Sequence, residues 1–182
     1  MKCSFAIALV AACLVARANT VFILPPEQLH FPVPPQETAY VLEEGDAFAR
    51  AAGLAHARPE GAFELRVWTQ STRSEEGDAY VLAKDRVTTY AITRRDGRLR
   101  VVRTSSRKFV AGPALLSALR AAHDAFGRPG CDVSDAPSAT VEASLDGKLV
   151  AFSGIDENGL CRDEPTVRMA ILLRDVRAAA GR

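Results

Sequence analysis

Three kinds of side chain in this 182-residue sequence could carry chemistry: two thiols, an imidazole and a group of guanidinium ions. Cys131 and Cys161 are the cysteines that follow the apolar N-terminal stretch, and His123 lies eight residues before the first of them. Guanidinium forks pair well with carboxylate and phosphate groups. The arginines predicted to share one face of a hairpin are Arg95, Arg98 and Arg100.

The two cysteines predict a disulfide. In an oxidising compartment an isolated even pair is typically joined, and Cys131 and Cys161 would close a loop of 30 residues. The alternative is a catalytic Cys131 close to His123. A reactive cysteine in such a compartment should leave an unpaired thiol, so the sequence favours the disulfide.

On a helical wheel, His123 projects at an angle between Leu116 and Leu119, inside the apolar stripe of a helix predicted over residues 113–126. Burial would keep the imidazole neutral and usable as a general base. The same position also suits a core histidine with one hydrogen bond. No serine, cysteine or acid is placed by sequence spacing to complete a nucleophile and base, so we predict no catalytic residue.

A metal site is not predicted either. The three histidines, His30, His56 and His123, are widely separated, and the acidic loop around Cys161 lacks the alternating acidic spacing of a calcium loop. The sequence contains no phosphate-binding glycine loop and no metalloprotease motif. We therefore expect no cofactor.

Seven basic residues and one acid, Asp96, occupy residues 94–108. The Asp96-Gly97 pair predicts a two-residue hairpin turn, whose register gathers Arg95, Arg98 and Arg100 on the solvent face. Two interpretations stay open: the three side chains hold an anionic partner, or they form a charged face that keeps the sheet soluble.

The elements that would position these residues belong to an α+β fold. A second turn at Asp146-Gly147 organises residues 138–154, and Leu145 then faces Lys148. We predict an antiparallel sheet built from Asp-Gly hairpins, with two main helices (113–126 and 165–179) on one face, in a ββα–ββα organisation. A looser helical pattern covers residues 36–56. The other predicted strands are 63–68, 79–83, 86–94 and 98–104.

The N-terminus predicts export. Residues 1–18 combine Lys2, an apolar run and a small-x-small site, which are typical of a signal peptide cleaved after Ala18. A rival interpretation is a lipobox with a lipid anchor at Cys13, but the apolar run continues beyond that cysteine. A proline-rich extended leader (19–36) and a single domain (37–182) would follow.

Charge and composition narrow the function classes. Removing residues 1–18 moves the formal net charge from +1 to −1, so nucleic acid is not the expected partner. We expect no transmembrane segment, and the excess of arginine over lysine favours a bacterial periplasmic or secreted protein.

The sequence is therefore interpreted as an exported binding or envelope-accessory domain that is not an enzyme, with an anionic protein or envelope component as its partner. The alternatives are a small periplasmic hydrolase with His123 as base and a secreted inhibitor or immunity protein. Oligomeric state stays open.

The first testable prediction concerns processing: the mature chain begins at Asn19, because the small-x-small site ends at Ala18. Intact-mass measurement of the natively exported protein checks it. A mass corresponding to a diacylated Cys13 would contradict it and place the protein on a membrane surface.

Overall fold

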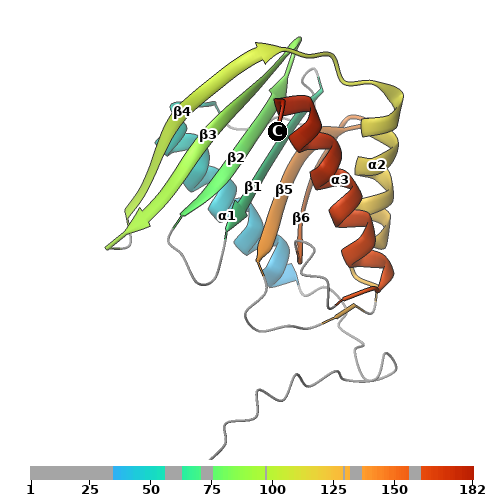
Figure 1. Cartoon of the computed structure of the whole chain (residues 1–182). Helices are drawn as coiled ribbons and strands as arrows, with labels where there is room; N and C mark the ends of the chain where they lie inside the picture. The colour runs from blue at the N-terminus through green and yellow to red at the C-terminus, as the bar shows by residue number, and fades with distance from the viewer. Residues whose placement is uncertain are drawn as a thin grey trace, which may run out of the picture.

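A computed structural model shows one antiparallel sheet with helices on both faces (Figure 1). It describes residues 35–55, 63–70, 76–96, 98–128, 130–131, 137–155 and 161–182, and in the first helix it describes side chains from Gly45 onward, together with Glu43. The predicted signal peptide, Cys13 and the leader up to residue 34 lie outside the described residues. The helices and strands are α1 (Pro35–Ala52), β1 (Glu64–Gln70), β2 (Glu76–Ala83), β3 (Arg86–Arg95), β4 (Arg98–Lys108), α2 (Pro113–Ala125), β5 (Ser138–Leu145), β6 (Lys148–Ile155) and α3 (Glu164–Ala180).

The sheet has six strands in the order β4-β3-β2-β1-β5-β6. The first four strands form a meander, and after α2 the chain returns to place β5 antiparallel to β1. Strand β1 therefore lies inside the sheet, and β4 and β6 form its edges. The α+β class and the antiparallel sheet predicted from the sequence are confirmed.

Two apolar clusters lie on opposite faces of this sheet. The larger joins α2 and α3 to alternate strand residues, including Leu65, Val67 and Val141. The smaller lies under α1, where Phe48 stacks on Trp68 with ring centroids 5.8 Å apart and meets Tyr90 edge-on at 5.7 Å. Since successive side chains of a strand point to opposite faces, neighbouring residues of β1 contribute to different clusters.

The two predicted helices, 113–126 and 165–179, match α2 and α3 to within one residue at each end, and both cover one face. The prediction of two main helices was incomplete, because α1 covers the opposite face (Figure 1). Helix α1 begins at Pro35, inside the segment predicted as extended leader. Proline suits a first helical turn, where its missing N–H has no intrahelical partner.

The turns at the two Asp-Gly pairs show positive φ. Asp146 and Gly147 have φ of 52° and 74°, and Leu145 lies opposite Lys148 in the pairing of β5 with β6. Asp96 has φ of 50°, and Arg95 lies opposite Arg98; Gly97 lies outside the described residues. The repeated ββα arrangement stays a prediction about organisation.

Cys131 and Cys161 form a disulfide, with Cα atoms 5.8 Å apart. Cys131 follows α2 and Cys161 precedes α3, so the bond joins the loops that enter and leave the β5–β6 pair. Two residues after the second cysteine, Asp163 caps α3 by accepting a hydrogen bond from the backbone N–H of Thr166 at 3.0 Å. None of the helices that the structure describes is long and apolar enough to span a membrane.

A buried ion pair joins β1 to β5 on the face of the sheet that α1 covers. Arg66 and Glu142 are opposite each other in the pairing of β1 with β5, and their side chains are 2% and 4% exposed. The guanidinium lies 3.7 Å from Glu142, donates to Glu64 at 2.7 Å and also donates to the carbonyl of Ala55, just after α1. One cation thus connects two strands and the end of a helix.

The disulfide yields a stability prediction. Changing both Cys131 and Cys161 to serine should lower the free energy of unfolding by about 3–4 kcal/mol, because a closed loop of this length reduces the entropy of the unfolded chain. Denaturant unfolding of the oxidised protein and of the double variant measures the difference. Equal stabilities, or two free thiols in denatured, unreduced protein, would contradict the prediction.

The buried ion pair yields another prediction. Arg66→Met should lower the free energy of unfolding by about 3–5 kcal/mol, because it leaves the buried Glu142 without its cross-strand cation. The double change Arg66→Met with Glu142→Met should cost less than the single change. Arg86→Met, at an exposed position of β3, serves as control and should stay within about 0.5 kcal/mol of the parent. A double variant less stable than Arg66→Met alone would contradict this account.

Candidate functional site

The candidate site is the basic ribbon face, defined as the exposed side chains of Arg95, Arg98 and Arg100 at the β3–β4 end of the sheet. Arg95 lies directly opposite Arg98, and Arg100 lies opposite Thr93. Directly opposed residues of an antiparallel pair have Cβ atoms about 4.5–5.5 Å apart. The structure therefore brings together the three arginines that the sequence placed on one face.

This face is the one turned away from α1. Leu99 and Val101 alternate with the arginines along β4 and pack against the cluster under α1, so Arg98 and Arg100 point to the opposite side. On that side α2 and α3 pack on β6, β5 and β1 and reach Leu82 of β2 and Val87 of β3, and β4 extends beyond them (Figure 1). The arginines thus stand on a part of the sheet that neither helix covers.

Opposing guanidinium groups repel, and among the described residues no carboxylate forms a salt bridge with any of these three. Other arginines do have acidic partners. Arg120 donates to both carboxylate oxygens of Asp146, at 2.8 and 3.1 Å, and this hydrogen bonding holds the pKa of Asp146 below its usual range. A cationic cluster with no salt-bridged carboxylate among the described residues is suited to an external anion.

The seven basic residues within 94–108 do not all lie on one surface. Strand alternation turns Arg94 toward the α1 face, where it lines a pocket, and places Arg103 opposite Tyr90 on that same face. Burial raises the pKa of Tyr90, and the nearby positive charges of Arg103 and Arg66 oppose that rise. An irregularity between Thr89 and Tyr90 shifts the later register.

At the C-terminal end of residues 94–108, Arg107 contacts helix α3. Arg107 donates to the carbonyl of Ala178 at 3.1 Å, near the C-terminus of α3, where a cation also suits the helix dipole. Arg182 pairs with Asp78 of β2. These contacts fasten the end of α3 to the sheet and mark the border of the uncovered area.

His123 is not the core residue that the apolar stripe predicted. Its side chain is 41% exposed, its ring meets Phe152 edge-on at 5.8 Å, and its Nδ1 lies 3.5 Å from the carboxylate of neighbouring Asp124. The buried positions of α2 are instead Leu115, Ala118, Leu119, Ala122 and Ala125. The buried face of the helix is therefore rotated away from His123.

A group of three potential metal ligands does occur among the described residues: Cys131, Cys161 and Asp163. The disulfide occupies both sulfur atoms, and Asp163 accepts hydrogen bonds from the backbone and the hydroxyl of Thr166. These three side chains are therefore engaged in holding the start of α3.

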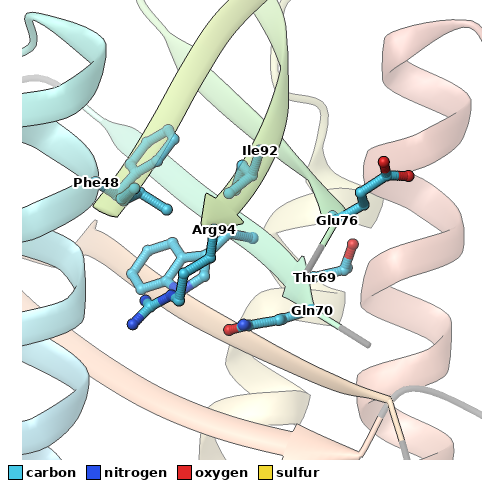
Figure 2. Close-up of a pocket in the computed structure, with 9 residues that line it drawn as sticks. Phe48, Thr69, Gln70, Glu76, Ile92 and Arg94 are labelled. Atoms are coloured by element: carbon cyan, nitrogen blue, oxygen red, sulfur yellow. The ribbon is translucent and has the colours of Figure 1, made fainter. Parts of the chain in front are cut away.

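A pocket between α1 and the sheet is lined by Phe48, Trp68, Ile92 and Arg94, and also by the polar residues Gln70 and Glu76 (Figure 2). The space in which the centre of a water molecule fits is about 20 Å³, which is enough for about one water. Cofactors and drug-sized ligands need several hundred Å³. This pocket is a packing gap rather than a ligand site.

Sequence reasoning missed two features of the candidate site. Val102, 59% exposed, lies beyond Arg100 on the basic ribbon face, opposite Ala91. The strand that carries it, β4, is an edge of the sheet. The alternation of β4 could have predicted the exposed Val102. The edge position of β4 could not be predicted in this way, because it depends on which strand pairs with β5.

No protein-family model matches the chain, and comparison with curated proteins finds no match.

Proposed function

We propose that this protein is an exported binding domain, without an enzymatic role, that holds an anionic partner on the basic ribbon face. The partner offers carboxylate or phosphate groups to Arg95, Arg98 and Arg100, as a protein or an envelope component. The N-terminal targeting pattern supports export, and the disulfide is compatible with an oxidising compartment.

The observation that carries the proposal is the cross-strand pair of Arg95 and Arg98 with Arg100 beside it, exposed and lacking an acidic partner among the described residues. Like charges directly opposite each other destabilise a strand pair. An anion bridging them removes this repulsion and forms charge-assisted hydrogen bonds.

The alternative of a hydrolase with His123 as base has less support. Among the described residues, the contacts of this imidazole are with the ring of Phe152 and the carboxylate of Asp124. Neither group is a nucleophile that a histidine activates in hydrolytic enzymes. The alternative of a secreted inhibitor or immunity protein is a special case of the binding proposal, in which the partner is an enzyme or toxin.

The test is a triple change of Arg95, Arg98 and Arg100 to glutamine in the mature chain. Folding should be nearly unaffected, because exposed substitutions usually fall within about 0.5 kcal/mol. Binding of fluorescent poly-glutamate and polyphosphate, and capture of partners from an envelope extract, should be lost. For the parent, binding should weaken as salt rises toward about 1 M, where the Debye length is about 3 Å.

A matched control removes the same charge elsewhere. Arg162, Arg168 and Arg174 are exposed on and before α3, and changing all three to glutamine alters net charge identically. This control should bind both polyanions like the parent. Equal losses in the two triple variants, or binding unchanged by the first, would reduce the basic ribbon face to a solubilising surface.

A further inference from the structure

Strand β4 is an edge of the described sheet as well as a basic surface. It is 11 residues long, and among the described strands only β3 pairs with it. On the outer side of such an edge, every second residue directs its backbone N–H and C=O away from the sheet. These groups offer a template on which another extended chain can form hydrogen bonds.

The charges of β4 select which chain can pair there. Residues 98–108 contain five basic side chains and no acidic one. Two copies of β4 placed edge to edge would set these cations against each other, which opposes self-association. An acidic strand meets complementary charge along the same edge. The edge therefore discriminates between a second copy of this protein and an acidic partner.

The two faces of β4 specify the partner in more detail. On the face away from α1, the strand presents Arg98, Arg100 and then the exposed Val102. On the α1 face it presents the half-buried Leu99 and Val101, followed by the exposed Arg103. An added strand places its side chains beside these residues on each face.

We infer that an extended acidic segment of a protein partner adds to the outer edge of β4, with carboxylates beside Arg98, Arg100 and Arg103 and apolar side chains beside Leu99, Val101 and Val102. This inference rests on the proposed function and names its ligand. Read opposite residues 103 to 98, an antiparallel partner has the pattern acidic, apolar, apolar, acidic, apolar, acidic. Antiparallel addition continues the pairing of the whole sheet.

The probe is a synthetic peptide containing Glu-Val-Val-Glu-Val-Glu, with capped ends. It should bind the mature protein, and NMR should show slower hydrogen exchange at alternate backbone amides of β4. Changing Arg98 and Arg100 to glutamine should weaken binding about tenfold or more, because the loss of even one charge-assisted hydrogen bond is worth about tenfold in affinity. Changing Arg168 and Arg174 to glutamine, with the same loss of charge, should leave binding unaltered.

Two N-methylated peptides test the backbone pairing at constant charge. In one, alternate residues are methylated; in the other, the intervening residues are methylated. Only one set of amides in an added strand faces β4, so one peptide should lose affinity about tenfold or more and the other should bind like the unmodified peptide. Equal affinities of the two methylated peptides would overturn the inference.

The outcomes separate this inference from the proposed function. If poly-glutamate binding depends on the basic ribbon face but the peptide leaves β4 amide exchange unchanged, anion binding stands and strand addition is wrong. If neither poly-glutamate, polyphosphate nor the peptide binds, both are wrong. Strand addition is supported only when the arginine changes and one of the two methylation patterns each weaken binding.

Discussion

The pairing of β1 with β5 is the constraint on which the rest of the structure depends. It joins residues 64–70 to residues 138–144, so the four-stranded meander and the later strand pair become one sheet. Once β5 occupies that side of β1, residues Leu65 to Trp68 are buried on both faces. The cost of closing so long a loop is offset by burial of apolar area against α1 on one face and α2 and α3 on the other.

This pairing also carries the charge pair of Arg66 and Glu142. Buried charges are costly unless paired and hydrogen-bonded, and Arg66 is satisfied by two carboxylates and the carbonyl of Ala55. Helix α1 approaches closely here, since a side chain at Gly45 would come within 2.9 Å of the Glu142 carboxylate. The pair therefore links the register of β1 and β5 to the position of α1 on the sheet.

The same topology decides which surface is free. Helices α2 and α3 pack on one face of the sheet from β6 as far as Val87 of β3, and β4 is the edge at the end opposite β6 (Figure 1). The contact of Arg107 with Ala178 closes the border between them. Beyond that border lies a face of the sheet that neither α2 nor α3 covers, and Arg95, Arg98 and Arg100 are exposed there.

Local features could be predicted from the sequence alone. Apolar periodicity placed α2 and α3 to within a residue, strand alternation placed Arg98 and Arg100 on one face, and the isolated cysteine pair indicated the bond between Cys131 and Cys161. Such signals lie in neighbouring residues or in composition, so they can be read before the chain folds.

The remaining features depend on tertiary contacts. Strand β4 is an edge because β5 pairs with β1 rather than with β4. Arg66 is buried because Glu142 and α1, which are distant in the sequence, pack against it. His123 is half-exposed because the core under α2 is centred on the face of Leu115 and Leu119, a choice set by how the helix packs. These outcomes follow from contacts between segments far apart in sequence, which periodicity within any one segment does not encode.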